Sequence, residues 1–325
     1  MRAIVCRELT GPAALRIEEL AEPLSGPGQV RIRVRACGVN FADSLITRGQ
    51  YQKQPATPFV PGFEVAGEVL EVGAGVTGFA PGDRVLALTP HGGYAEQVAA
   101  DITRCVPIPP TMSWEHAAGF PVVFGTSHVA LWHRARLQAG ETLVVHGASG
   151  GVGLTAVAIG KRLGATVIAT ASGPAKLAVA REHGADHLID SSREDVRERI
   201  RDLTAGRGAD VVYDPVGGAL FTASLRSIAF EGRILVIGFA GGDVPQIPAN
   251  HLLVKNVDVI GVNWPAYAEL LPRVMIESFA TLVQWYLDGA IQVHVSATYP
   301  LARAVEALDQ VVSRKSTGKV VITTE

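Results

Sequence analysis

The sequence contains little cysteine and no long apolar run. Its three cysteines, Cys6, Cys37 and Cys105, are isolated and have no CxxC spacing, which fits a reducing compartment, so we expect the cytoplasm. No segment reaches the roughly 18 apolar residues of a membrane-spanning helix, so we expect no membrane span. The first residues, MRAIVCRELTG, alternate in polarity, which predicts a first strand rather than a secretion signal.

An excess of charge of one sign is also missing. The chain has 29 Lys and Arg against 31 Asp and Glu, and its net charge is −2. Without a basic block, we expect no nucleic acid among its partners. A length of 325 residues with 48% hydrophobic content predicts a globular chain of two domains.

The segment from Glu141 to Ala171 predicts a nucleotide-binding unit. An apolar run is followed by the glycine-rich turn HGASGGVG, an amphipathic helix and a second apolar run. Such a turn lies at the end of a buried parallel strand and at the start of a helix, where free N–H groups and the helix dipole favour a phosphate. Gly150 would let a pyrophosphate approach, and Gly153 would let the helix pack closely on the strand. The first position of the glycine fingerprint holds Ala148.

The end of the second strand favours NADPH over NADH. NAD-dependent enzymes usually have an acidic residue there for the ribose hydroxyl, whereas this chain has Ser172 and then Lys176. The lysine would attract a 2′-phosphate. The alternative is that Lys176 is an ordinary solvated lysine at the start of a helix.

Hydrophobic periodicity divides the chain into three parts. Residues 1–121 contain short strands separated by turns, as QVRIRVRA at 29–36 illustrates, and predict a compact barrel. Residues 122–264 begin with a helical pattern from Gly125 to Leu137, after which strand and helix patterns alternate and predict six parallel strands in a doubly wound sheet. One of the predicted helices runs from Pro174 to His183, with Pro174 in its first turn and Gly184 past its end. Residues 265–325 are expected to return to the first domain.

Six motifs in order along nearly the whole chain carry a family resemblance. They are CGVNFADSLITRGQY (37–51), PGFEVAGEV (61–69), PGDRV (81–85), GGYAE (92–96), HGASGGVG (146–153) and STGKVVI (316–322). Together they resemble the zinc-free, zeta-crystallin-like quinone oxidoreductase branch of the medium-chain dehydrogenase/reductase superfamily. The resemblance implies an α/β fold with a chaperonin-10-like β-barrel catalytic domain and a six-stranded parallel Rossmann domain. It also implies a homodimer joined through the Rossmann sheet edge.

The positions of the family's zinc ligands predict no metal in this chain. Where the zinc-dependent alcohol dehydrogenases have cysteine and histidine, this sequence has Asn40 and Phe63, and the third ligand position falls at Val122 and Val123. None of these side chains is one that zinc prefers. Without a Lewis acid to stabilise an alkoxide, we expect hydride transfer to a good acceptor rather than alcohol oxidation.

The resemblance also implies the site residues. Asn40 would bond near the nicotinamide ribose and the acceptor. Asp43 would orient Asn40 or the backbone, or be only an acid at a helix N-terminus. Tyr51 could donate to the reduced oxygen or be a packing residue. Thr126 would open a helix beside the nicotinamide, although a threonine there can be only a cap. Lys319 would approach the cofactor phosphates, or be an ordinary solvated lysine. The remaining predicted cofactor contacts are Ala148, Ser149, Gly150, Gly151, Val152, Ser172, Lys176, Gly238, Phe239, Asn263 and Trp264.

Three functions remain open at this point. The first is NADPH-dependent reduction of a quinone in the cleft between the domains. The second is reduction of an activated carbon–carbon double bond in an enone or enoyl thioester, with Tyr51 as proton donor. The third, a structural or RNA-binding role as in zeta-crystallin, is disfavoured because the whole glycine turn is kept.

Overall fold

The computed structural model describes residues 1–324, which form two compact units. Unit 1 comprises Met1–Val122 and the chain from Gln292 onward, and unit 2 is Val123–Ile291. The return to the first unit therefore falls at residue 292 and not at 265. The reason is that the helices after residue 264 pack within unit 2: the rings of Trp264 and Phe279 lie 5.5 Å apart, and His128 hydrogen-bonds Ser278.

Unit 1 is built on a seven-stranded sheet in which β3 is the longest strand. β3 (Gln29–Val39) pairs antiparallel with β4 (Glu64–Val72) and β15 (Lys319–Thr323). The alternating burial expected for residues 29–36 is present along it. The sheet continues through β5 (Arg84–Leu88), β6 (Gln97–Asp101), β7 (Cys105–Pro107) and β14 (Val295–Pro300), and β1 (Arg2–Val5) and β2 (Arg16–Glu19) form a separate pair.

Short helices flank these strands. They are α1 (Phe41–Ile46), α2 (Trp114–Ala118), α11 (Ala304–Val312) and the 3-10 turns η1 (Pro12–Ala14), η2 (Ile102–Arg104) and η4 (Leu301–Arg303). Apolar side chains from β3, β4, β15 and α11 meet in one core, which includes Ile32, Val65, Val320 and Leu308. This core supports the polar residues at the start of α1.

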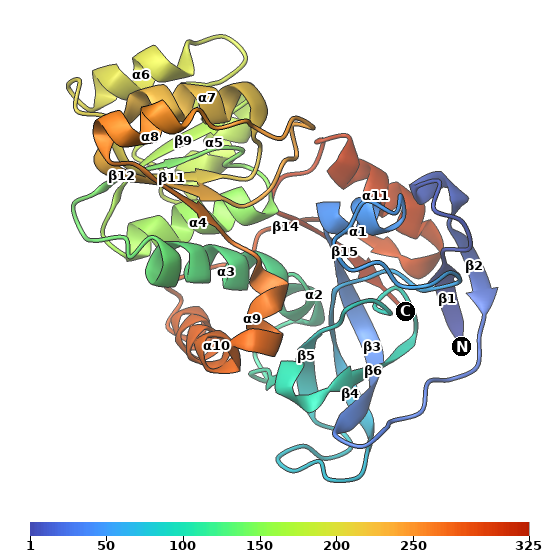
Figure 1. Ribbon diagram of the computed structural model, residues 1–325. Helices are drawn as coiled ribbons and strands as arrows, with labels where there is room; N and C mark the ends of the chain where they lie inside the picture. Colours follow the sequence, from blue (N-terminus) through green and yellow to red (C-terminus); the bar gives the residue numbers. More distant parts are fainter. Residues whose placement is uncertain (325) are drawn as a thin grey trace. The chain divides into compact units, whose positions relative to one another are not determined.

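Unit 2 contains the predicted six-stranded parallel sheet, with helices on both faces (Figure 1). Its strand order is β10-β9-β8-β11-β12-β13, so the chain runs outward from β8 in one direction and then from β11 in the other. Ligands collect at such a reversal, beyond the carboxyl ends of the strands. The strands are β8 (Thr142–Val145), β9 (Thr166–Ala171), β10 (His187–Asp190), β11 (Ala209–Asp214), β12 (Ile228–Val236) and β13 (Asp258–Gly261).

The central strands are buried on both faces, as expected for a covered parallel sheet. All four residues of β8 are buried. The helices of unit 2 are α3 (Pro121–His128, whose first two residues belong to unit 1), the π-helical segment η3 (Val129–Arg134), α4 (Gly151–Arg162), α5 (Pro174–Glu182), α6 (Val196–Leu203), α7 (Gly218–Ser227), α8 (Ala249–Lys255), α9 (Trp264–Leu270) and α10 (Pro272–Leu287).

Helix α3 begins earlier than the sequence pattern predicted. The expected helix started at Gly125, but Pro121 opens α3, because its fixed φ and missing N–H suit the first helical position. Thr126 therefore lies inside the helix and is not its cap.

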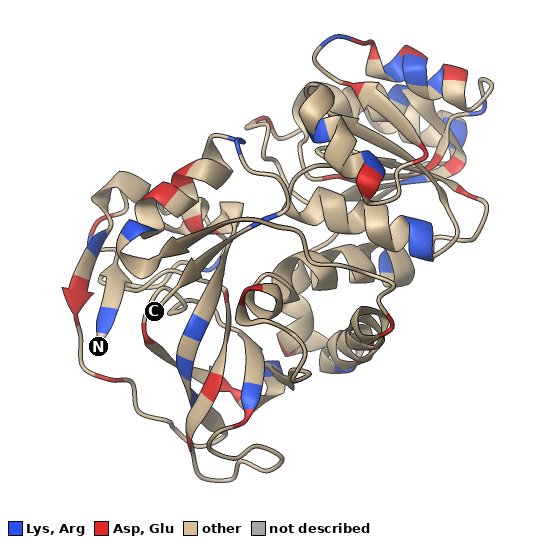
Figure 2. Cartoon of the chain, turned by 180° about the vertical axis from the view of Figure 1, so that it is seen from behind, with Lys and Arg blue, Asp and Glu red and all other residues tan. Residues whose placement is uncertain are grey.

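Basic and acidic residues are interspersed along the described part of both units (Figure 2). Residues 1–324 contain no helix with the length and hydropathy required to cross a bilayer.

Candidate active site

The glycine turn between β8 and α4 has the geometry of a phosphate-binding site. Gly150 is the N-cap of α4, and the first helical hydrogen bond runs from the Leu154 N–H to the Gly150 carbonyl at 2.8 Å. The N–H groups of the preceding residues in this turn have no partner within the helix and carry the positive end of its dipole. Gly151 and Val152, in this first turn, are partly exposed.

Two glycines of the turn are needed for different reasons. A Cβ on Gly153 would lie 2.2 Å from the Gly147 carbonyl oxygen, so the fold itself requires glycine there. Gly150 has an ordinary φ of −79°, and a Cβ on it would meet only the Gly147 oxygen, at 3.4 Å. The space above Gly150 is therefore open on the side where a pyrophosphate would approach, and the turn fits a dinucleotide.

Ala148 and Ser149 are the buried residues at the base of this turn. The Ala148 N–H donates to the Thr170 carbonyl at 3.0 Å, which ties the turn to β9. The N–H of Ala148 is therefore used within the protein. Of the predicted phosphate contacts, Gly150, Gly151 and Val152 are the more accessible residues.

The end of β9 carries Ser172 and Lys176 as predicted. Ser172 is exposed, and Lys176 lies in the first turn of α5. The parallel pairing of β9 with β10 brings an acid to this place that the linear sequence did not indicate. Asp190 accepts hydrogen bonds from the Gly173 N–H at 3.1 Å and from Ser192, and these bonds lower its pKa.

The other predicted contacts of unit 2 differ in exposure. Gly238 and Phe239 follow β12, and Asn263 is the exposed N-cap of α9. Trp264 is only 3% exposed. A Cβ on Gly125 would lie 2.3 Å from the Trp264 ring, so this ring is mainly a packing group against α3.

Thr126 is buried in α3, and its neighbour Ser127 links α3 to the glycine turn. The Ser127 hydroxyl lies 2.9 Å from the Val152 carbonyl, 2.8 Å from Thr155 Oγ1 and 2.9 Å from the Tyr213 hydroxyl. The sequence analysis missed this buried network, because serine in a helix carries no signal of its partners. The network connects the helix bearing Thr126 to the first turn of α4.

In unit 1, Asn40 is the N-cap of α1, and the Asp43 carboxylate in the first turn of the helix accepts from its backbone. The Asn40 N–H donates to Asp43 Oδ2 at 2.8 Å, and the Gly62 N–H donates to Asp43 Oδ1 at 3.1 Å. Burial raises the pKa of Asp43 to about 7, although the Asn40 N–H acts in the opposite direction. Asp43 therefore fixes the backbone of Asn40 and Gly62, and it is also the acid in the first turn of α1.

The side chain of Asn40 contacts a buried ion pair. Lys319 Nζ lies 2.7 Å from Glu64 Oε1, 2.9 Å from Asn40 Oδ1 and 2.9 Å from the Val39 carbonyl. Both predictions for Lys319 are therefore wrong, since it is neither solvated nor free to reach a phosphate. An ammonium has three N–H donors, and all three are used.

Glu64 is the residue of this cluster that the sequence analysis missed. Its side chain is fully buried; Oε1 also accepts from Asn40 Nδ2 at 2.8 Å, and Oε2 accepts from the Val122 N–H at 2.7 Å. A glutamate at the start of a strand usually faces water, so its position gave no signal of burial. The PGFE motif that contains it was the only available indication.

Tyr51 packs beside the cluster. Its ring centroid lies 5.0 Å from that of Phe63, and burial, followed by the charge of Asp43, raises its pKa. The side chain is half-buried. A phenol in this environment stays protonated at neutral pH and can donate a hydrogen bond.

Both units contain residues that match families of known proteins. Residues 26–110 match the alcohol dehydrogenase GroES-like domain, and residues 151–285 match the zinc-binding dehydrogenase family. A quinone oxidoreductase-like protein 2 homolog from Nematostella vectensis is 40% identical over 100% of this chain and 89% of its own length. The chain belongs to the zinc-free quinone oxidoreductase branch of the medium-chain dehydrogenase/reductase superfamily. The predicted α/β fold, with a GroES-like domain and a Rossmann domain, is confirmed.

Two solved structures of relatives match almost the entire chain. A mycobacterial protein solved in complex with NADPH is 33% identical, with a TM-score of 0.94, 99% of this chain covered and 100% of that one. Escherichia coli quinone oxidoreductase, also solved with NADPH, is 28% identical, with the same TM-score and the same coverage.

As in this zinc-free branch, the positions of the zinc ligands hold other side chains. Asn40 is engaged with Glu64 and Lys319, Phe63 packs in the core, and the backbone of Val122 binds Glu64. Among residues 1–324, no cluster of three His, Cys, Asp or Glu side chains is arranged to hold a metal ion. These residues do not fit the metal named in the matched zinc-binding family.

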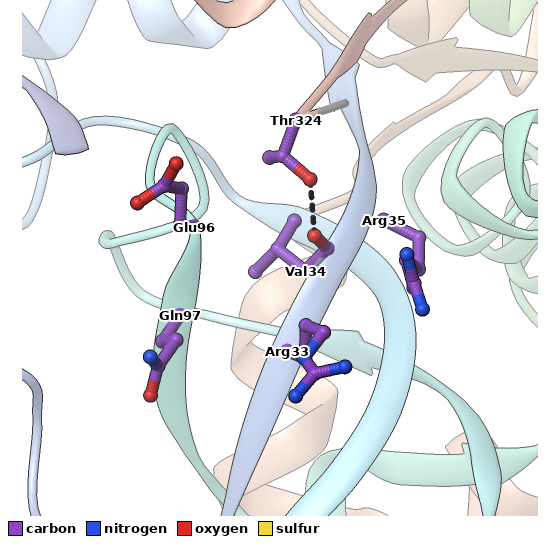
Figure 3. Close-up of a pocket in the computed structure, with 6 residues that line it drawn as sticks. All are labelled: Arg33, Val34, Arg35, Glu96, Gln97 and Thr324. Atoms are coloured by element: carbon purple, nitrogen blue, oxygen red, sulfur yellow. Dashed lines mark hydrogen bonds between the residues drawn. The ribbon is translucent and has the colours of Figure 1, made fainter. Parts of the chain in front are cut away.

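Figure 3 shows a surface cavity of unit 1. It measures about 240 Å³ and is lined by residues of β3 and β6 together with Glu96 and Thr324. Its two arginines, Arg33 and Arg35, lie 4.0 Å and 3.2 Å from Glu68. None of the predicted site residues lines this cavity, and its charges are paired on the protein.

Proposed function

We propose that this protein reduces a quinone with hydride from NADPH. Family membership shows that the protein is an oxidoreductase that uses NADPH. We propose that its acceptor is a quinone. The open space above Gly150 at the start of α4 supports the cofactor. The observation that carries the quinone is the set of side chains at the zinc-ligand positions. In unit 1, the absence of zinc ligands at positions 40, 63 and 122 favours an acceptor that needs no Lewis acid.

The residues of unit 2 would hold the cofactor along the carboxyl ends of the strands. Gly151 and Val152 would bind the pyrophosphate through backbone N–H groups, and Gly150, whose own N–H donates to the Gly147 carbonyl at 2.9 Å, would let it approach closely. Ser172 and Lys176 would bind the 2′-phosphate of the adenosine ribose. The further contacts that we propose are Thr126, Gly238, Phe239, Asn263 and, through its limited exposed edge, Trp264.

Bound NADPH supplies a hydride and leaves the protein to orient the reactants and exclude water. A quinone suits such a site, because the negative charge that arrives on its oxygen is delocalised around the ring. The Asn40 side chain would orient the nicotinamide ribose, with Asp43 fixing its backbone. Tyr51, held protonated by its surroundings, would donate a hydrogen bond to the reduced oxygen.

A second acceptor class is supported by the same tyrosine. Reduction of an enone or enoyl thioester needs a proton donor at the α-carbon, and Tyr51 could supply that proton. Thioesters of coenzyme A would in addition need a basic surface for their phosphates.

Stopped-flow oxidation of NADPH by several acceptors tests the proposal. We expect 1,4-benzoquinone or 9,10-phenanthrenequinone to oxidise NADPH rapidly and crotonyl-CoA to leave it unchanged. Fast oxidation by crotonyl-CoA alone would overturn the quinone proposal in favour of double-bond reduction. Tyr51→Phe should abolish the reduction of a double bond, which needs the proton of Tyr51. The same substitution should lower the rate of quinone reduction to a smaller extent.

We further propose a homodimer formed through β13. This strand pairs with β12, and no other strand of the described chain pairs with its outer edge. Nearby, α8 exposes Leu253 and Val254, which are 77% and 76% accessible. Sedimentation velocity should give a dimer for the native protein and a monomer for Leu253→Glu/Val254→Glu, and a native monomer would contradict the proposal.

The three buried thiols are compatible with the cytoplasmic location that we propose.

A further inference from the structure

The polar atoms of the Asn40 carboxamide are almost fully committed within unit 1. Nδ2 donates to Glu64 Oε1 at 2.8 Å and to the Gly38 carbonyl at 3.3 Å. Oδ1 accepts from Lys319 Nζ at 2.9 Å. A carboxamide has two N–H donors and two acceptor lone pairs, so only one lone pair of Oδ1 remains.

The chemistry of the neighbours fixes the orientation of this carboxamide. Lys319 Nζ can only donate, so the Asn40 atom that faces it must be the oxygen. The Gly38 carbonyl and the carboxylate of Glu64 can only accept, so the atom that faces them must be the nitrogen. Turning the amide by 180° would break all three bonds and place donor against donor.

The carboxylate of Glu64 is also fixed in position by its neighbours. A Cβ on Gly38 would lie 2.3 Å from Glu64 Oε1, so the carboxylate passes directly over a residue that has no side chain. Its second oxygen binds the Val122 N–H in the first turn of α3. Glu64 and Lys319 are both nearly inaccessible to water, at 0% and 3% of their side-chain surface.

We infer that Lys319 and Glu64 are positioning residues that hold the Asn40 carboxamide in one orientation, so that Asn40 meets its ligand only as a hydrogen-bond acceptor. The inference rests on the proposed function, in which Asn40 contacts the nicotinamide ribose. A ligand of matching chemistry is a hydroxyl or an amide N–H, such as a ribose hydroxyl. Asn40 then has no donor for the oxygen of a reduced quinone, and that bond must come from another residue.

Paired substitutions separate this role from simple stabilisation. Lys319→Met removes the donor to Asn40 and leaves Glu64 buried without its counter-ion, so both the Tm and the hydride-transfer rate should fall. Lys319→Met/Glu64→Gln is neutral and nearly isosteric, so its Tm should recover. The glutamine introduced in place of Glu64 can pair with either end of the amide. Asn40 is then held only by its 3.3 Å bond to the Gly38 carbonyl, and the rate should stay about tenfold or more below that of the native enzyme.

A second pair tests the acceptor role directly. Asn40→Asp/Glu64→Gln exchanges amide and carboxylate, keeps the net charge beside Lys319 and preserves an acceptor at position 40. We expect it to keep a rate within about tenfold of the native enzyme, while Asn40→Leu loses about a hundredfold. A donor role would give the opposite result, with the exchange variant as slow as Asn40→Leu.

The measurements are the single-turnover rate of NADPH oxidation, the Kd for NADPH and the Tm, using whichever acceptor the native enzyme reduces. The Kd should change by less than about threefold in the Lys319 variants, because the phosphate-binding turn is intact. If the rate instead returns with the Tm in Lys319→Met/Glu64→Gln, the pair is only structural and the inference is overturned. Failure of the proposed function would look different, since no quinone would then oxidise the NADPH bound to the native enzyme.

Discussion

The α-carbon of Gly153 faces the carbonyl oxygen of Gly147 so closely that a Cβ built on Gly153 would lie 2.2 Å from that oxygen. Three residues earlier, a Cβ on Gly150 would have one neighbour, at 3.4 Å. The same turn therefore contains one glycine required by the fold and one whose open side is free for a ligand.

Alanine at these two positions should have different effects. Gly153→Ala should lower the free energy of unfolding by about 1–3 kcal/mol through overpacking. Gly150→Ala should leave the Tm nearly unchanged but weaken NADPH binding, and Gly150→Asp should abolish it by placing a negative charge at the phosphate site. Thermal melts and titration of NADPH fluorescence measure both effects. Unchanged NADPH affinity in Gly150→Asp would contradict the assignment of the turn.

Lys176→Ala should weaken the binding of NADPH and leave that of NADH unchanged. Loss of one charge-assisted hydrogen bond to the 2′-phosphate corresponds to about 1–2 kcal/mol, or roughly a tenfold higher Kd. Lys161→Ala is the control, because it removes a lysine of unit 2 that lies in α4 and binds Asp186 at 2.8 Å. An equal loss for both cofactors in Lys176→Ala would show that this lysine does not read the 2′-phosphate.

Asp43 should make the protein less stable as the pH rises from 4 to 7. Its pKa of about 7 in the folded protein exceeds the 3.8 of an ordinary aspartate, so between these values the native state holds a proton that the unfolded state has released. The free energy of unfolding then falls with pH, by at most about 4 kcal/mol, and levels off above pH 7. Urea unfolding of Asp43→Asn should lack this decline. The exposed Asp258→Asn is the control and should retain it.

His128 should make the protein less stable as the pH falls from 6.5 to 4. Burial lowers its pKa from 6.5 to about 4, and its Nδ1 lies 2.9 Å from Ser278 Oγ. The unfolded state therefore binds more protons between these values, and the associated stability, about 3 kcal/mol, is present above pH 6.5 and lost as the pH falls to 4. His128→Gln should flatten this loss in urea unfolding, whereas His251→Gln on α8 should not. A variant with an unchanged acid limb would show that His128 is protonated in the native state.

The parts of the structure that depend on local sequence were predictable. The six parallel strands of unit 2 and the glycine turn follow from apolar runs and turn residues that are adjacent in the chain. Helix α5 begins at Pro174 and ends just before Gly184, as capping residues indicated. The start of α3 was misplaced, because the helical pattern was recognised only from Gly125 onward, whereas the helix opens at Pro121.

What depends on the pairing of distant strands was not predictable from the sequence. Lys319 and Glu64 meet because β15 and β4 flank β3, with Val320 opposite Val39 and Val65 opposite Cys37. Periodicity identifies each strand but not its neighbours. For the same reason Asp190 was overlooked beside Gly173, where the pairing of β10 with β9 brings it.

The sequence separation of Glu64 and Lys319, 255 residues, has a consequence for synthesis. Unit 2 is one continuous stretch, Val123–Ile291, and all of its strands have left the ribosome before β15 is made. Unit 1 cannot be completed until β15 is translated, because until then β3 lacks its β15 neighbour and Glu64 lacks its counter-ion. A nascent chain stalled before residue 319 should therefore hold a protease-resistant Rossmann unit beside an N-terminal segment that remains open to cleavage.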